Sequence, residues 1–143
     1  MKYLYGFLII MTFIGCTFSS NRTVINGLED RFEAEEITKA FFNYQETGSN
    51  DILELFRNTY LNKIGKDSLQ AFLKQKKMVL GNLKRDSLEK WETKIEKGQN
   101  SSSEYFFKYY NEYENNTVTE SFKMTKGFFG QIKIIEYKYE IKK

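Results

Sequence analysis

The spacing of the apolar residues changes once along this chain, at about Leu88, and this change limits the folds that the chain can adopt. Before Leu88, apolar residues recur at intervals of three and four, which is the period of a helix with one buried face. After Leu88 they alternate with other residues, which is the period of a strand. Helices followed by a run of strands predict an α+β domain, in which the helices pack on an antiparallel sheet.

The first predicted helix starts in an acidic stretch after Glu29, as the helix dipole prefers, and stops near Gly48. Its predicted buried face consists of apolar residues at helical spacing: Ile37, Ala40, Phe41 and Tyr44. A short second helix is predicted after a cap at Asn50. The long first helix is therefore expected to cover one face of the sheet.

A third helix is predicted from a cap at Asp67 or Ser68 to Gly81. Its apolar stripe is formed by residues that share one face: Leu69, Phe72, Leu73, Val79 and Leu80. Lys76 interrupts this stripe.

Four strands are predicted after Leu88, joined as an antiparallel meander with a turn at Asn115-Asn116. Their alternating positions are occupied by β-branched, aromatic and other apolar residues: Trp91, Thr93 and Ile95; Tyr105, Phe107, Tyr109 and Tyr113; Val118, Phe122 and Met124; Ile132 and Ile134. From Ile135 onwards the apolar residues fall on the other parity, which predicts a β-bulge in the last strand. A bulge bends a sheet, so the expected fold is N-terminal helices on a curved, cone-like four-stranded antiparallel sheet.

The composition of the 143 residues excludes several kinds of chemistry. The sequence contains no histidine and one cysteine. It therefore has no Ser-His-Asp or Cys-His arrangement, no metal site that uses histidine, and no internal disulfide or thiolate cluster. We expect no metal, no cofactor and no catalytic residue of these kinds.

The beginning of the chain has the features of an export signal. Lys2 precedes the apolar stretch 3–14, which is shorter than the roughly 20 residues that cross a bilayer, and Gly15 then precedes the single cysteine, Cys16. The tetrapeptide Phe13-Ile14-Gly15-Cys16 resembles the lipobox of bacterial lipoproteins, with Phe13 in place of the usual leucine. The resemblance implies cleavage before Cys16 and attachment of lipid to its thiol, with an uncleaved anchor or a simple export signal as the alternative.

These features give three segments: a signal peptide over 1–15, a lipidated tether over 16–28 and a single α+β domain over 29–143. The tether contains no acid before Glu29, whereas acids follow the cysteine in many surface-exported lipoproteins. We therefore expect a protein of the bacterial cell envelope that is anchored to a membrane through its N-terminal lipid and faces the periplasm.

Two segments, FFNYQETGSNDILELF over 41–56 and MVLGNLKR over 78–85, resemble those of small exported bacterial proteins of unknown function. The order of elements resembles the cone-shaped α+β fold of the ketosteroid isomerase-like and nuclear transport factor-like superfamily. This resemblance implies a fold and no particular activity, because the superfamily includes enzymes, binding proteins and scaffolds.

The enzyme form of that superfamily would use a carboxylate base in an apolar site, with a tyrosine as an oxyanion donor. All four aspartates fall at predicted helix starts, turns, caps or loops, and no acid is expected inside an apolar strand face. Glu136, beside the predicted bulge, is the nearest exception, and a solvent-facing strand position is the favoured interpretation for it. We therefore expect no buried carboxylate with a raised pKa.

The many aromatic residues allow two interpretations. Five of them could line an apolar pocket between helix and sheet: Tyr44, Trp91, Tyr105, Tyr109 and Tyr137. The favoured interpretation is that they form the core, since aromatic residues pack well on strands. The expected space between helix and sheet is then small or filled.

These residues and their pattern thus favour a non-catalytic binding or accessory module, which recognises a protein partner or a small apolar ligand through its exposed sheet face or its loops. The alternative is a small-pocket enzyme of ketosteroid isomerase-like type with a carboxylate base. The stretch 66–85 is basic, but a solvated helix face explains such a run, and the formal net charge of the whole chain is only +3. No nucleic-acid partner is expected.

Overall fold

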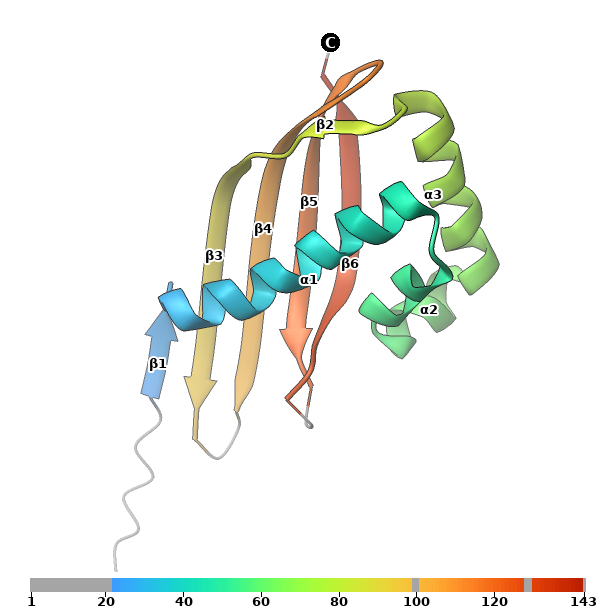
Figure 1. The fold of residues 1–143 in the computed structure, drawn as a ribbon. Helices are drawn as coiled ribbons and strands as arrows, with labels where there is room; N and C mark the ends of the chain where they lie inside the picture. The colour runs from blue at the N-terminus through green and yellow to red at the C-terminus, as the bar shows by residue number, and fades with distance from the viewer. Residues whose placement is uncertain (1–21, 99–100, 128–129, 143) are drawn as a thin grey trace, which may run out of the picture.

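The computed structural model describes residues 22–98, 101–127 and 130–142. Within these ranges, four helices lie on one side of an open antiparallel sheet of six strands (Figure 1). The predicted α+β class, with helices packed on an antiparallel sheet, is confirmed. The predicted number of strands is wrong, because two short strands join the four that the alternation identified.

The helices follow one another along the chain with short connections: α1 (Leu28–Thr47), the 3-10 helix η1 (Asn50–Leu55), α2 (Asn58–Ile64) and α3 (Lys66–Leu80). Helix α1 ends where predicted, at Gly48, which has a left-handed backbone conformation with φ of 71°. The predicted caps are displaced by a residue or more. Ser49 caps η1 by accepting the N–H of Asp51, and Gly65 precedes α3 without a side-chain cap.

The strands are β1 (Arg22–Ile25), β2 (Leu83–Arg85), β3 (Leu88–Lys97), β4 (Ser102–Tyr113), β5 (Thr117–Lys126) and β6 (Ile132–Ile141). Strands β3 to β6 form the predicted antiparallel meander. Strand β1 pairs with the other edge of β3, and β2 pairs with β4. Both added strands are antiparallel to their partners.

Strand β1 lies inside the range 16–28 that the sequence analysis assigned to the tether, so the folded part begins before residue 29. Asn26 joins β1 to α1 and has a positive φ of 54°. Its backbone N–H donates to the carbonyl of Thr93 at 2.9 Å, and its side-chain oxygen accepts the N–H of Thr93 at 2.9 Å. The short strand has mostly exposed side chains, so it carries no apolar alternation that would reveal it in the sequence.

The predicted bulge in β6 is confirmed. Ile134 pairs with Met124 and Glu136 pairs with Lys123, so Ile135 is the additional residue in the ladder. Ile134 is fully buried under the helices, whereas Glu136 is on the opposite face of the sheet. The bulge thus lets both halves of β6 direct their apolar residues inward.

Helix α1 crosses the sheet over β3 to β6 (Figure 1), and its buried face differs from the predicted one. The buried residues are Ala34, Thr38, Phe41, Phe42 and Gln45. Two polar residues take inward positions because they find partners there: Thr38 shares a hydrogen bond with the hydroxyl of Tyr109 at 2.6 Å, and Gln45 donates to the carbonyl of Leu73 at 3.1 Å. An apolar stripe alone could not identify them.

Aromatic rings fill the space between α1 and the sheet. Phe41 contacts Phe122 edge-to-face with ring centroids 5.0 Å apart, and Phe42 contacts Tyr109 in the same way at 5.1 Å. Tyr137 completes this cluster, with its ring centroid 4.7 Å from that of Phe41. The inner face of the sheet is therefore a packed core.

Candidate functional site

The most unusual group in this core is an ion pair between Lys76 of α3 and Glu120 of β5. The Nζ and Oε2 atoms are 2.7 Å apart, and both side chains are 0% exposed. Lys76 points inward because it shares a helix face with the buried leucines of α3. Glu120 points inward because it has the same strand parity as the buried residues Val118 and Phe122.

The ammonium group of Lys76 has a partner for each of its three N–H bonds. It donates to Oε2 of Glu120, to the side-chain oxygen of Gln45 at 2.8 Å and to the hydroxyl of Tyr113 at 2.9 Å. An ammonium group has three donors and no acceptor, so this set is complete.

The carboxylate of Glu120 is also fully occupied. Besides Lys76, it accepts the Tyr137 hydroxyl at 2.5 Å, an N–H of the Asn111 side chain at 3.1 Å and the Tyr113 hydroxyl. A carboxylate offers about four acceptor positions, and all are used here. We call these six residues the Lys76–Glu120 network: Gln45, Lys76, Asn111, Tyr113, Glu120 and Tyr137.

The titration behaviour of the network follows from its burial. Burial lowers the pKa of Lys76, and the adjacent Glu120 carboxylate opposes this decrease. Burial and then the charge of Glu120 raise the pKa of both Tyr113 and Tyr137. The tyrosines are therefore neutral hydrogen-bond donors at neutral pH. The network joins α3 to the sheet through an ion pair whose two side chains are 0% exposed.

Glu120 corrects the expectation that no acid lies inside an apolar strand face. Val118, Phe122 and Met124 define that face by their alternation, and Glu120 lies between them at a position of the same parity. Two features of the sequence indicate this pair: an acid occupies an inward strand position, and Lys76 lies inside the apolar stripe of a helix. Two opposite charges at inward positions of different elements can be buried together at far lower cost than either alone.

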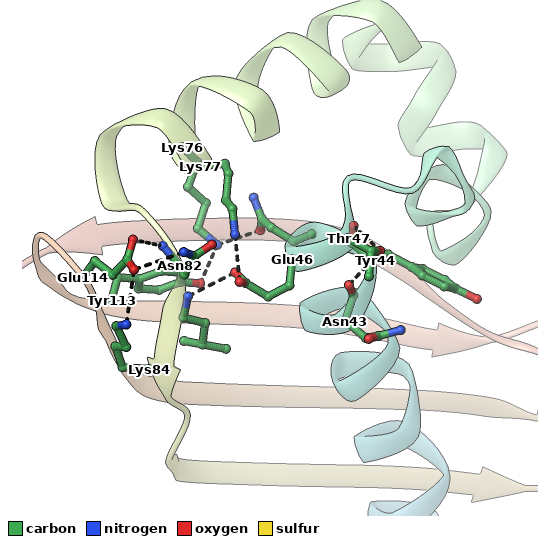
Figure 2. A network of polar contacts seen from close by, with 12 residues as sticks. Asn43, Tyr44, Glu46, Thr47, Lys76, Lys77, Asn82, Lys84, Tyr113 and Glu114 are labelled. Atoms are coloured by element: carbon green, nitrogen blue, oxygen red, sulfur yellow. Dashed lines mark hydrogen bonds and ion pairs between the residues drawn. The ribbon is translucent and has the colours of Figure 1, made fainter.

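Figure 2 shows further polar contacts near the C-terminal end of α1 and the turn after α3, next to Lys76 and Tyr113 of the Lys76–Glu120 network. Glu46 forms an ion pair with Lys77 at 2.8 Å. Glu114 accepts the backbone and side-chain N–H groups of Asn82 at 2.9 and 3.0 Å and pairs with Lys84 at 3.2 Å. These hydrogen bonds, the backbone one first, lower the pKa of Glu114 to about 2. The contacts fix the turn after α3 to the hairpin between β4 and β5.

The residues predicted to line a pocket lie in the core or at its edge. Three are buried, Tyr105, Tyr109 and Tyr137, and two are half-buried, Tyr44 and Trp91. Tyr109 and Tyr137 use their hydroxyls in the hydrogen bonds given above, whereas the buried hydroxyl of Tyr105 has no hydrogen-bond partner among the residues that the structure describes. Of these five, only Tyr105 belongs to either of the two surface pockets described below.

Glu136 lies on the face of the sheet opposite the helices, which agrees with the favoured solvent-facing interpretation. Its carboxylate forms ion pairs with Lys138 at 2.5 Å and Lys123 at 3.2 Å. Hydrogen bonds from these two lysines lower the pKa of Glu136. A base with a raised pKa would need the opposite shift, so Glu136 lacks this property.

The outer face of the sheet, opposite the helices, contains a surface pocket of about 870 Å³. We call it the outer-face pocket. Its lining comes from β1, β3, β4, β5 and β6 and includes Ile25, Phe106, Lys123, Thr125 and Ile135. The bulge residue Ile135 and the aromatic ring of Phe106 give it an apolar part, and glutamate and lysine side chains flank it. Its volume is within the range of small-molecule sites.

A second pocket of about 510 Å³ lies beside η1 and α2, where Phe56, Arg57 and Lys133 contribute to its lining. Neither pocket is lined by Glu120. In the part of the chain that the structure describes, no three His, Cys, Asp or Glu side chains are grouped so that they could hold a metal ion. No helix among the described residues has both the length and the apolar character needed to cross a membrane.

Comparisons with protein-family models, with curated proteins and with solved structures found no match to this chain. The geometry of the described residues is therefore the basis for assigning a function. The predicted lipid-attachment residue, Cys16, and the predicted signal peptide lie outside the described residues.

Proposed function

We propose that this protein is a lipid-anchored protein of the bacterial cell envelope that acts as a non-catalytic binding or accessory module. The lipobox-like stretch ending at Cys16 supports the anchor, and the absence of acids between Cys16 and Glu29 supports a location facing the periplasm. The resemblance to the nuclear transport factor-like fold is part of the same proposal. It is supported by a long helix across an antiparallel sheet with a bulged last strand, the feature from which a curved, cone-like shape was predicted.

One observation carries the non-catalytic part of the proposal. The buried carboxylate of Glu120, the group best suited to act as a base, is fully hydrogen-bonded, 0% exposed and paired with Lys76. General acid–base catalysis requires the acid or base to come within hydrogen-bond distance of the substrate. A carboxylate with four internal partners does not meet this requirement.

The outer-face pocket is the proposed binding site, for a protein partner or a small apolar ligand. The helices cover the other face of the sheet and leave this face open (Figure 1). Phe106 and Ile135 provide an apolar area on it, and Lys123 adds a charged group at its side. Apolar area with a few polar groups at its margin is typical of ligand and partner sites.

Site-specific photocrosslinking in cells tests this site. A photoreactive phenylalanine analogue at position 106 keeps an aromatic ring in the outer-face pocket, and the same analogue at Met78, which is 83% exposed on α3, is the control. We expect a discrete crosslinked product from position 106 and none from position 78. Equal products at both positions, or none at 106, would contradict the proposed site.

The alternative function, an enzyme of ketosteroid isomerase-like type, has one observation in its favour. Glu120 accepts hydrogen bonds from two tyrosines, which are the residue types that such a site would use. Access to Glu120 would require α3 to move away with Lys76, which would leave a buried carboxylate without its counter-ion. The binding module is therefore the better-supported proposal.

A further inference from the structure

Three large apolar side chains are exposed where β1 joins α1. Ile25 is 68% exposed, Leu28 is 60% exposed and Phe32 is 59% exposed. Leu28 and Phe32 are one turn apart on the same side of α1, whereas Ile25 pairs with Lys94 and lines the outer-face pocket. We call Leu28 and Phe32 the N-terminal apolar patch. It exposes side chains whose burial would each contribute about 1.5–3 kcal/mol.

The chain before β1 shows what lies close to this patch. Only residues 17–21 separate Cys16 from Arg22, the first residue of β1. A fully extended chain spans at most about 3.3–3.6 Å per residue, so Cys16 can be no more than about 20 Å from the start of β1. If Cys16 carries lipid, as the proposed function holds, this end of the molecule must stay next to the bilayer.

We propose that the N-terminal apolar patch inserts into the bilayer interface, as a second membrane contact beside the lipid on Cys16. This inference rests on the proposed function. Apolar side chains that a short link holds against a bilayer can be buried in it with little additional loss of freedom, because the lipid has already restricted the position of the protein. The patch then fixes the orientation of the domain as well as its distance from the membrane.

The charges near the patch indicate insertion by apolar contact. Glu29 and Asp30 follow Leu28 directly, and Arg31 lies over the rings of Phe32 and Trp91 at 5.9 and 5.1 Å. In the first turns of α1 both signs of charge are therefore present, and these turns have no cluster of basic residues that would bind anionic lipid. The depth of insertion should be similar in vesicles of phosphatidylethanolamine with phosphatidylglycerol and in vesicles of phosphatidylcholine alone.

The test uses the full chain, acylated at Cys16 and reconstituted into these two kinds of vesicle. Cys16 is the single cysteine, so once it is acylated a nitroxide can be attached only to an introduced cysteine. Phe32→Cys places the nitroxide in the patch, and Met78→Cys, 83% exposed on α3, is the matched control. Accessibility to oxygen, which concentrates in lipid, is compared with accessibility to a water-soluble nickel complex.

We expect the nitroxide at position 32 to lie about 5–10 Å inside the headgroup boundary in both kinds of vesicle, the depth at which interfacial helices bury their apolar face. The nitroxide at position 78 should be in water. If Phe32→Cys does not fold, as circular dichroism would show, Leu28→Cys takes its place.

Three results would overturn the inference. A nitroxide at position 32 as accessible to nickel as the one at 78 would overturn this inference alone, provided that mass spectrometry shows the acyl group on Cys16. Spin–spin broadening at position 32 with an aqueous signal would assign the patch to a second copy of this chain. An unmodified Cys16 thiol would overturn the proposed anchor and this inference together.

Discussion

Lys76 and Glu120 are completely removed from water, whereas Lys77 and Glu46 beside them remain 28% and 30% exposed. Transfer of an ion from water to a protein interior costs several kcal/mol even after relaxation, so a buried pair is tolerated only when its hydrogen bonds are complete. The Lys76–Glu120 network meets this condition, and Gln45 contributes to it by accepting a hydrogen bond from Lys76. Its two charges therefore depend on each other much more than surface charges do.

A double-mutant cycle measures this dependence. We expect Lys76→Met or Glu120→Gln alone to lower the free energy of unfolding by about 3–5 kcal/mol, because each leaves an uncompensated group in the core, and the double variant to lose clearly less than the sum. Urea denaturation gives the four values. Lys123→Met with Glu136→Gln, an exposed pair between β5 and β6, is the control and should show coupling of no more than about 1 kcal/mol. Additive losses of unfolding free energy at the buried pair would contradict the expected coupling between Lys76 and Glu120.

Glu114 gives a prediction on acid stability. Its pKa in the folded protein is about 2, below the ordinary value of 4.5, so its carboxylate stabilises the fold above pH 4.5, and this contribution is lost as the pH falls from 4.5 towards 2. We expect Glu114→Gln to lower the urea midpoint at pH 7. The urea midpoint of this variant should also decrease less than that of the unchanged protein between pH 4.5 and pH 2. Glu29→Gln, in the first turn of α1, is the control. If the urea midpoints of Glu114→Gln and of the unchanged protein decreased in parallel with pH, the lowered pKa of Glu114 would be contradicted.

At this scale the sequence was informative about residue types and less so about partners. The aromatic core around Phe41, Tyr109 and Phe122 could be predicted because these residues follow the period of their elements. The contact between Lys76 and Glu120 could not be predicted in the same way, because both occupy inward positions of their elements but their pairing depends on how α3 lies against β5. Periodicity contains no information on such a contact between distant elements.

Strand β1 is the element whose role differs most from the prediction. It covers the outer edge of β3 over Lys94 to Lys97, and Asn26 adds two hydrogen bonds to Thr93. An uncovered strand edge presents unpaired backbone groups, which promote association between copies. Although β1 is short, it therefore has a protective role.

Removal of β1 tests this role. We expect a chain that starts at Leu28 to be less stable than one that starts at Arg22 by about 2–4 kcal/mol, because each lost hydrogen bond contributes about 1 kcal/mol. It should also associate as its concentration rises. Urea denaturation and sedimentation velocity provide the two measurements. A monomeric chain from Leu28 with unchanged stability would show that β1 is dispensable.

The predictability of the elements depended on their length. Strands β3 to β6 and helices α1 and α3 are long enough to show a clear period, and even the bulge at Ile135 appeared as a change of parity. Strands β1 and β2 and helix α2 are short and expose most of their residues. Their positions are set by backbone pairing and connections, which leave little trace in the pattern of apolar residues.

For the whole molecule, the proposed anchor assigns different tasks to different surfaces. The first turns of α1, with Leu28 and Phe32, would face the membrane, and the outer face of the sheet would remain available for a partner. This arrangement depends on lipid at Cys16, the residue at the end of the lipobox-like stretch.

Metabolic labelling with palmitate tests the anchor. We expect the unchanged protein to be labelled and to stay with the membrane fraction, and Cys16→Ala to lose the label and to accumulate as an uncleaved precursor or a released form. Thr17→Ala, at the neighbouring position, is the control and should be labelled normally. Label that persists in Cys16→Ala would contradict the lipoprotein proposal.

The pairing of β1 with β3 also has a consequence for the order in which the molecule matures. A chain that leaves a ribosome or a translocation channel N-terminus first releases β1 well before β3, whose Thr93 lies 67 residues after Asn26. Strands β3 to β6 can pair with the next strand as each emerges, but β1 must wait for a partner from the second half of the chain. During that interval β1 itself, Arg22–Ile25, is not yet held by the sheet. An enzyme that acts on β1 would thus meet an unpaired strand, and pairing of β1 with β3 would end that period.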